Sequence, residues 1–297
     1  MNKSPTKNSD MKADSCSSVV IVGIVKNIES TINDDYQRLT KAFSRFGKID
    51  FFVVESGSDD NSVQVLDELS RTQKNFSFLH LETSSSLSRT SNMAIARNAY
   101  LSYLREGSIL SKYKYVVIAD FNNLNNKLNR DSINSCWTID SWDVVTANQS
   151  GRYYDIWALR HPIWSPNDCW EAVAFYRKYF KFPELALGYV LRARSIRIPR
   201  ESEWIEVESA FGGLAIYRSE ILNSDAIYDG ISSDGKVICE HVPFHNQLRL
   251  NGARIYVNPA MINARITDHS RRLSIFFTIL RIGRYPQKII AKRINRN

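Results

Sequence analysis

A short polar run follows an apolar segment in the first half of the chain. Residues 113–119 are mostly aromatic or β-branched, as in a buried strand, and Asp120 and Asn122 come directly after them. In α/β sheets, ligands bind beyond the ends of such strands. Asp-x-Asn spacing places both side chains on one side of an extended chain, where their oxygens suit Mn²⁺ or Mg²⁺. The alternative is that Asp120 and Asn122 merely begin a turn.

Two features of the second half also suit a binding site. Gly212 and Gly213 precede a β-rich run, and paired glycines indicate either a bulge or backbone that passes close to another group. Residues 152–180 are dense in aromatic side chains. We expect most of these in the core, including an amphipathic helix from about Asn167, and one or two of them, such as Trp157, in a site where rings stack on sugars.

The elements that must position these residues alternate between strand and helix. This alternation is typical of βα units and a largely parallel sheet. The first strand-to-helix turn has no G-x-G-x-x-G pattern, which argues against an ordinary NAD-binding domain. The hydrophobic periodicity predicts strands at 19–25, 49–55, 76–81, 113–119, 143–146 and 253–259, and helices at 36–43, around Leu66 and Leu69, at 91–105 and after Pro243.

Length and composition limit the class of protein. The chain has 297 residues, 43% of them hydrophobic and 24% charged, which fits one large soluble α/β domain with or without a small appendage. The net charge of +8 favours anionic partners. The four cysteines are scattered and show no paired zinc-ligand spacing, which argues against a zinc site. A reducing compartment fits them, and disulfides are the alternative.

The two ends of the chain differ from the rest. Residues 1–18 are polar, and we expect them to be disordered. No apolar run is long enough for a membrane span, and the run at 19–25 is too short and too β-branched for a signal peptide. Residues 270–297 are basic and amphipathic. That tail either lies on an anionic membrane surface or forms a helix docked on the domain.

Four short motifs occur in the order found in nucleotide-sugar glycosyltransferases of the GT-A fold. ADFN, which contains Asp120 and Asn122, resembles the DxD motif that binds a divalent metal and the donor diphosphate. FGG at 211–213 resembles the glycine-containing loop beside the acceptor, and CEH at 239–241 resembles the xED region. His269 resembles the C-terminal histidine that completes the metal shell.

Longer stretches are similar to mannosyltransferases of the capsule-associated and yeast-mannan type. The resemblance covers roughly Val19 to His269 and implies a GT-A, Rossmann-like α/β fold with a mostly parallel central sheet flanked by helices, followed by the basic C-terminal tail. The stretches that carry it are YYDIWALRHP at 153–162, AFGGLAIYR at 210–218, NGARIYVNP at 251–259 and ARN at 96–98.

The resemblance assigns a donor site. Asp120, Asn122 and His269 are the expected ligands of Mn²⁺ or Mg²⁺. Asn122 replaces the second aspartate of the motif, which removes a negative charge and should weaken metal affinity or shift metal binding toward the diphosphate. The expected contacts to the phosphates, the base or the ribose are Lys26 and Arg97, with Glu55, Ser56 and Asp59.

The resemblance also assigns an acceptor side. In an inverting enzyme Glu240 is the expected base, whereas in a retaining enzyme it positions the acceptor or the sugar. Asp155 is the second acidic candidate, and its alternative is a structural partner for a nearby arginine such as Arg160. His241 and His245 are expected to be structural. The acceptor-side residues are Gly212, Gly213 and Trp157.

These assignments imply one domain over residues 19–269, with a nucleotide-binding half at 19–123 and an acceptor half at 124–269. The expected reaction moves a sugar, mannose from GDP-mannose by resemblance, from a GDP- or UDP-linked donor to a glycan or glycolipid acceptor of a surface polysaccharide, at the cytoplasmic face of the cell membrane. One alternative is a catalytically degenerate scaffold, suggested by Asn122. The other is a polyanion-binding protein, suggested by the charge, although no nucleic-acid partner is expected because no RNA-binding motif occurs.

Overall fold

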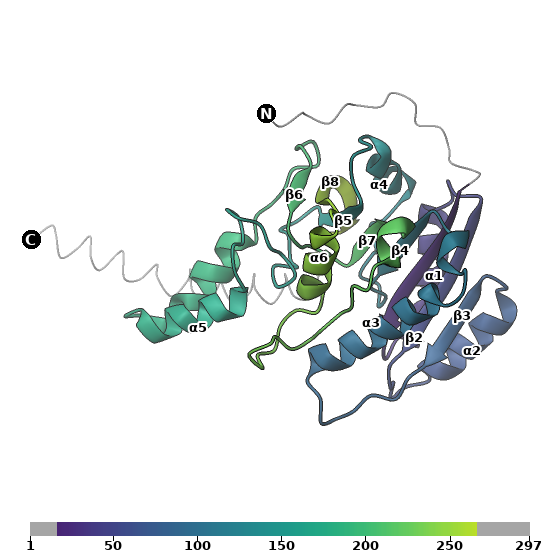
Figure 1. Ribbon diagram of the computed structural model, residues 1–297, viewed down its shortest axis with the longest axis horizontal. Coiled ribbons are helices and arrows are strands. Elements are labelled where there is room, and N and C mark those ends of the chain that lie inside the picture. The colour runs from purple at the N-terminus through teal and green to yellow at the C-terminus, as the bar shows by residue number, and fades with distance from the viewer. Residues whose placement is uncertain (1–16, 266–297) are drawn as a thin grey trace, which may run out of the picture.

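Eight strands form one mixed sheet in the order β3-β2-β1-β4-β7-β5-β8-β6 (Figure 1). The computed structural model describes residues 17–265, so the N-terminal segment up to residue 16, His269 and the basic tail lie outside the described part. The strands are β1 Ser18–Val25, β2 Lys48–Glu55, β3 Phe76–His80, β4 Tyr115–Ala119, β5 Val144–Gln149, β6 Ile205–Val207, β7 Leu214–Arg218 and β8 Ile255–Ala264. The α-helices are α1 Ile32–Ala42, α2 Ser62–Thr72, α3 Arg89–Arg105, α4 Arg130–Asn134, α5 Cys169–Tyr179 and α6 His241–Leu250.

The first four strands form the parallel part of the sheet. β1 pairs in parallel with both β2 and β4, and β2 pairs in parallel with β3. The expected alternation of strand and helix is therefore confirmed, and β1 begins at Ser18, one residue earlier than expected. The chain builds outward from β1 to β2 and β3, then returns to place β4 on the other side of β1. Ligands bind at such a reversal of strand order, beyond the carboxyl ends of the strands.

β7 joins the two halves of the chain in one sheet. It lies antiparallel between β4 and β5, with Leu214 opposite Ala119. The glycine pair that precedes β7 therefore stands directly beside the end of β4. The Asp120 N–H donates to the Gly213 carbonyl at 2.9 Å, which fixes the two segments together.

β8 is longer than the predicted strand, which ended at Pro259. It continues to Ala264 because the pairing with β5 slips around the proline: Thr146 lies opposite Val257, but Asn148 lies opposite Ile262. A proline has no N–H to donate and is tolerated within a sheet at such irregularities. The expectation of a strand end at Pro259 was wrong for this reason.

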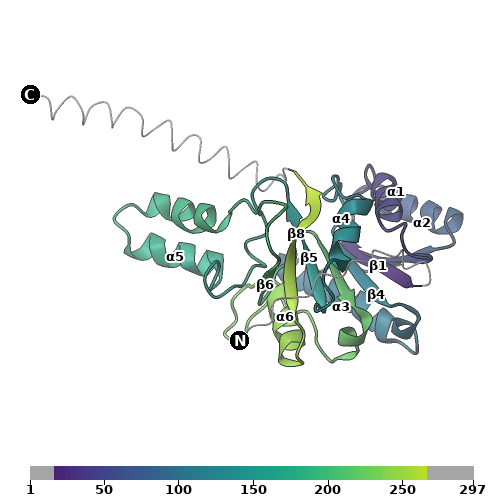
Figure 2. The same ribbon diagram turned by 90° about the horizontal axis from the view of Figure 1, so that it is seen from above.

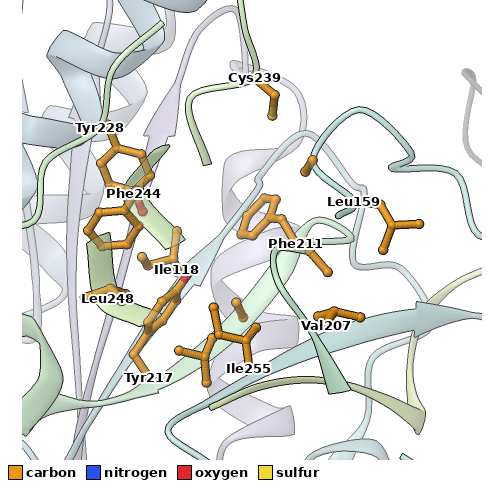
Figure 3. Close-up of a cluster of buried hydrophobic side chains, with 14 of the residues drawn as sticks. Ile118, Leu159, Val207, Phe211, Tyr217, Tyr228, Cys239, Phe244, Leu248 and Ile255 are labelled. Atoms are coloured by element: carbon orange, nitrogen blue, oxygen red, sulfur yellow. The ribbon is translucent and has the colours of Figure 1, made fainter. Parts of the chain in front are cut away.

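Two hydrophobic cores cover the two faces of the sheet. Alternate residues of β1 supply them, since successive side chains of a strand point to opposite faces. Val19 and Ile21 pack with α1 and α2, whereas Val20 and Val22 pack with α3 and α6. Figure 3 shows part of the second core, in which the rings of Tyr228 and Phe244 stack with centroids 4.1 Å apart. α3 and α6 are thus held against the same face of the sheet.

A helical arm formed by α5 and the turns after it projects from the body (Figures 1 and 2). α5 begins at Cys169, close to the predicted Asn167, and the Asp168 side chain accepts the N–H groups of the first turn. The expectation that most aromatic residues of this region lie in the core holds only in part, because Trp170, Phe175, Tyr179 and Phe180 are exposed on the arm. None of the helices within residues 17–265 has the length and apolar character needed to cross a membrane.

Candidate functional site

A cavity of about 790 Å³ opens at the carboxyl ends of β1 and β4, where the strand order reverses. Lys26 follows β1 and lines it, as do Asp120 and Asn122 after β4. Ser56, directly after β2, lines it too, and Arg89 contributes from the start of α3. The cavity therefore collects two cationic side chains, one carboxylate and several neutral polar groups from four separate segments.

Asp120 is the carboxylate of this cavity. Its side chain keeps 32% of its surface exposed. Burial raises its pKa to about 6 against the lowering effect of the Arg97 guanidinium, and the charges of Asp155 and Glu240 raise it further. Asp120 is thus placed where it can contact a ligand, in surroundings that disfavour its charge.

Arg97 lies between the carboxylates of Asp120 and Glu240 and does not line the cavity. Its side chain is only 1% exposed, and its Nε donates to Glu240 Oε1 at 2.9 Å. Its Nη2 stands 3.6 Å from Asp120 Oδ1, and its guanidinium lies 5.3 Å from the centre of the Phe211 ring. The expectation that Arg97 contacts the phosphates or the base is not supported by this geometry, because the side chain is enclosed and paired with Glu240. Its position allows it to fix two carboxylates relative to each other.

The glycine pair passes close to its neighbours, as predicted. Gly212 has φ +70°, and a Cβ built there would stand 2.5 Å from the Ala147 carbonyl oxygen. Gly213 has φ +85°, and its Cβ would stand 2.5 Å from Leu124 and 2.8 Å from the Tyr154 hydroxyl. At Gly212 only glycine fits both the left-handed backbone and the space, since the neighbour there is backbone. At Gly213 the neighbours are the ends of side chains, and the left-handed φ is the stronger constraint. The loop therefore fixes the cavity wall formed by Leu124 and Tyr154.

Asp155 holds the glycine loop through a hydrogen bond. Its Oδ2 accepts the Gly212 N–H at 2.9 Å. Burial raises the pKa of Asp155, the charge of Glu240 adds to that, and the Gly212 N–H opposes it. Arg160, the arginine named as a structural partner for Asp155, was the wrong one, because its Nη2 binds Asp168 Oδ2 at 2.8 Å instead. The charge of another arginine, Arg97, does act on Asp155 and opposes the rise in its pKa that burial causes.

Trp157 lies beside the base of the arm. Its Nε1 donates to Asp168 Oδ2 at 2.9 Å, and its half-buried ring packs against the core. It does not line the cavity at the ends of β1 and β4. Its expected contact with an acceptor therefore stays a prediction, made for a side chain whose polar atom already has a partner.

Glu55, Ser56 and Asp59, which were expected to contact the base or the ribose, take different positions in the structure. Ser56 lines the cavity. Glu55 is completely buried, and its carboxylate accepts the Ser58 N–H at 2.6 Å and contacts His80 Nδ1 at 2.5 Å. Asp59 is exposed and does not line the cavity. Glu55 is therefore occupied in holding its own loop, which does not support the expected contact with a base or ribose.

Asn122 departs from the predicted backbone. The expectation of an extended chain through it was wrong, because Asn122 and Asn123 have φ 70° and 58°. Asparagine tolerates this left-handed conformation better than most residues. Asn122 nevertheless lines the same cavity as Asp120.

The fit of these residues to a divalent cation is partial. Within residues 17–265 no group of three histidine, cysteine or acidic side chains converges on one point. His269, the third expected ligand, lies outside that range. Asp120 and Asn122 offer two oxygen ligands, which suits a cation such as Mg²⁺ that is bound by one or two protein oxygens together with a substrate's phosphates and water.

Sequence reasoning missed the loop between β3 and α3. Thr83, Ser84 and Ser85 line the cavity, and Arg89 and Asn92 follow in the first turn of α3. The signal was present in the sequence as a run of serines before a helix start. Such residues cap helices and supply hydrogen bonds to anions at helix N-termini.

The two histidines of α6 are buried. His245 accepts or donates hydrogen bonds at both ring nitrogens, to Ser209 Oγ at 2.9 Å and to the Tyr217 hydroxyl at 2.7 Å. Burial lowers its pKa to about 3, with help from the Arg97 charge, so it is neutral. His241 stacks on Phe211 with ring centroids 4.1 Å apart, and burial lowers its pKa as well. This geometry agrees with the structural role expected for His245.

The fold and the site define an α/β protein with a cavity of polar, cationic and apolar lining at the switch point of a mixed sheet. The chain matches no protein-family model and no curated protein.

Solved structures of glycosyltransferases are similar to it. The mannosyltransferase PcManGT from Pyrobaculum calidifontis, in complex with GDP-Man and Mn²⁺, is 16% identical over 89% of this chain and 60% of that chain, with a TM-score of 0.47. TarS 1–349 from S. aureus, in complex with UDP-GlcNAc, is 16% identical over 86% of this chain and 60% of that chain, with a TM-score of 0.46. The chain thus spans 60% of the length of each.

Proposed function

We propose that the protein is a glycosyltransferase that binds a nucleotide-sugar donor in the cavity at the ends of β1 and β4. One observation carries the proposal: a cavity of about 790 Å³ at the switch point has Lys26, Arg89 and Asp120 in its walls. Its volume is in the range of pockets that enclose small ligands. Cations beside a carboxylate suit a diphosphate, alone or with a divalent metal.

The donor-side residues act on the leaving group. Lys26 and Arg89 face the space that a diphosphate would fill and neutralise its charge. The hydroxyl of Ser56 and the side chain of Asn92 are available to the ribose, the base or the phosphates. Asp120 and Asn122 would hold Mn²⁺ or Mg²⁺, which when bound supplies further charge neutralisation to the departing diphosphate.

The acceptor-side residues act on the incoming hydroxyl. Glu240 Oε1 is held by Arg97, which leaves Oε2 to take the proton of the acceptor hydroxyl as that oxygen bonds to the anomeric carbon. Because the Glu240 side chain is only 3% exposed and does not line the donor cavity, this role requires the bound acceptor to open a path to Oε2. The bond from the anomeric carbon to the diphosphate breaks, and its electron pair leaves on the diphosphate. Asp155 acts as a positioning residue because it holds the glycine loop through the Gly212 N–H.

Two substitutions separate these roles. Glu240→Gln should lower sugar transfer by about 10²- to 10⁴-fold, the usual contribution of a general base, while nucleotide binding persists. Asp155→Ala should mainly weaken acceptor binding, since the Gly212 N–H loses its acceptor and the loop is displaced, whereas the base stays. Transfer by Glu240→Gln at the wild-type rate would remove it as the base.

The proposed donor sugar, acceptor and location rest on the resemblance of the sequence motifs to those of mannosyltransferases. We propose mannose from GDP-mannose as the donor group, and a glycan or glycolipid of a surface polysaccharide as the acceptor. We place the reaction at the cytoplasmic face of the membrane, where the sequence of the basic tail suits an anionic surface.

Thermal unfolding with GDP and UDP, each with and without Mn²⁺, tests the donor site. A nucleotide at 100 times its dissociation constant adds about 2.7 kcal/mol, which raises Tm by about 5 to 10 °C for a chain of this size. We expect a Mn²⁺-dependent shift with one nucleotide, lost in Asp120→Asn. That variant should be at least as stable as the wild type at pH 7.5, because burial disfavours the charge that it removes.

Asp225→Asn is the matched control. It makes the same change on an exposed side chain beside Arg105, at the opposite end of α3 from Arg89. It should keep the nucleotide shift. The absence of any shift with either nucleotide in the wild type would refute the proposal and favour a scaffold without donor binding.

A further inference from the structure

A second hollow surface lies beyond the carboxyl ends of β5 and β8. Two adjoining cavities, of about 490 and 630 Å³, share Ser150 and Arg197 in their walls. We name the cationic side chains of these walls the basic rim. It consists of Lys127, Arg152, Arg197, Arg200 and Arg265.

The positive charges of the basic rim are not paired with carboxylates of the described residues. All five of its residues are exposed, and none forms an ion pair with a residue in the range 17–265. Among the described residues that line the two cavities, Glu201 is the single carboxylate. Arg152 Nη1 donates to the Ser195 carbonyl at 2.6 Å, which anchors this guanidinium at the wall. A concave surface lined by one sign of charge attracts the opposite sign.

The basic rim lies next to the proposed donor cavity. Leu124 lines that cavity, and Lys127 lines the rim three residues later, so their Cα atoms are at most about 11 Å apart. Tyr154 lines the donor cavity and Arg152 the rim, two residues and at most about 7 Å apart. The end of β5, directly before Ser150, is also tied to the glycine loop, because the Gln149 side chain donates to the Gly212 carbonyl at 3.2 Å.

We propose that the basic rim binds the acceptor, and that the acceptor is an anionic glycan that carries phosphate or carboxylate groups about one or two sugar units from the hydroxyl that reacts. This inference rests on the proposed glycosyl transfer. The separation from the donor cavity matches a short run of sugars, and guanidinium groups bind phosphate and carboxylate oxygens through paired N–H groups.

A membrane surface fits the basic rim less well than a glycan does. Membrane-binding surfaces combine cations with projecting apolar side chains. Here the cations line hollows, and the large exposed aromatic side chains gather on the arm instead, as Phe175, Tyr179 and Phe182. A polar chain that lies along the two adjoining cavities matches this shape.

Binding of three oligomers of six units each to the full chain tests the proposal. The probes are a glycerol-phosphate hexamer, a hyaluronan hexasaccharide with its carboxylates, and neutral maltohexaose, measured by thermophoresis at low and physiological salt. We expect the first or the second to bind and maltohexaose not to bind. The anionic probe that binds more tightly identifies which anionic group the acceptor carries.

The variant Arg197→Gln/Arg265→Gln should weaken binding of the anionic probe by about tenfold or more. It should leave the nucleotide-induced rise in Tm unchanged, because neither residue lines the donor cavity. The matched control is Arg177→Gln/Lys178→Gln, which removes two exposed cations from α5 and should bind the probe as the wild type does.

Several results would overturn the proposal. Equal binding of maltohexaose, or unchanged binding of the anionic probe by the rim variant, would remove the rim as an anionic glycan site. Loss of binding to anionic phospholipid vesicles in the rim variant, with oligosaccharide binding unchanged, would assign the rim to a membrane. If the anionic probe binds but no nucleotide does, the proposed function fails and the rim is a polyanion site without transfer.

Discussion

Arg97 offers the sharpest test of how the site is held together. Its side chain is 1% exposed and its Nε contacts Glu240, whose side chain is 3% exposed. Arg97→Met keeps a long unbranched side chain but leaves Glu240 buried near Asp120 and Asp155 without a cation. Removal of one partner from a buried ion pair costs about 3 to 5 kcal/mol, because the other charge stays uncompensated.

A second substitution should recover part of this loss. In Arg97→Met/Glu240→Gln the orphaned charge is gone, so the double variant should be more stable than the sum of the single variants by about 2 to 3 kcal/mol. Urea unfolding followed by tryptophan fluorescence measures all the free energies of unfolding, since the chain has six tryptophans.

Arg105→Met is the matched control on the same helix. Its Nε and Nη2 donate to the carbonyls of Leu222 at 2.9 Å and Ala226 at 2.7 Å, which are neutral acceptors. We expect a loss of about 1 to 2 kcal/mol from these bonds. If Arg97→Met destabilised the protein no more than Arg105→Met, or if the double variant showed simple additivity, the argument that Arg97 compensates Glu240 would be refuted.

Three further outcomes are expected. Because burial lowers the pKa of His245 from 6.5 to about 3, the folded protein binds fewer protons than the unfolded chain between these values. The free energy of unfolding should therefore fall by about 1.4 kcal/mol per pH unit for this residue as pH drops from 6.5 toward 3, and His245→Gln should flatten the measured slope by that amount. Gly252→Ala, at φ +90° with open space around its Cβ, should lower the free energy of unfolding by about 1 to 2 kcal/mol. Gly212→Ala should lower it by at least about 2 kcal/mol more, because its Cβ would meet the Ala147 carbonyl. Equal losses for the two variants in urea unfolding would contradict this crowding. Asn122→Asp should tighten Mn²⁺-dependent nucleotide binding in calorimetry, since aspartate tolerates the same backbone, and unchanged Mn²⁺ dependence would exclude this side chain as a ligand.

Much of the fold could be predicted because its signals are local. β1 and β4 consist mostly of apolar residues that are β-branched or aromatic, and β2 contains such a run at 51–54; these runs indicate buried parallel strands directly. The position of Asp120 followed from the end of β4. The insertion of β7 between β4 and β5 could not be predicted, because pairing between distant strands leaves no mark in the periodicity of either strand.

The site was harder to predict because its contacts are distant in the sequence. Arg97 and Glu240 are separated by 143 positions, and the helical pattern around Arg97 places it on a helix without indicating its partner. Glu55 stands at a strand end that suggests a ligand contact, yet the nearby Ser58 N–H and the distant His80 occupy its carboxylate. A strand end indicates where a site lies, whereas neighbours brought together by the fold decide which side chains reach it.

The place of β7 in the sheet has a consequence for synthesis of the chain. β4 ends at Ala119 and β7 begins at Leu214, so residues 120–213 must be made before β4 gains its second neighbour. At roughly 5 to 20 residues per second, this delay is roughly 5 to 20 seconds. During it, the nascent β3-β2-β1-β4 sheet presents the unpaired edge of an entirely apolar strand, the kind of edge that pairs with other chains. The element that joins the two halves of the sheet is thus also the one that covers this exposed edge of the growing chain.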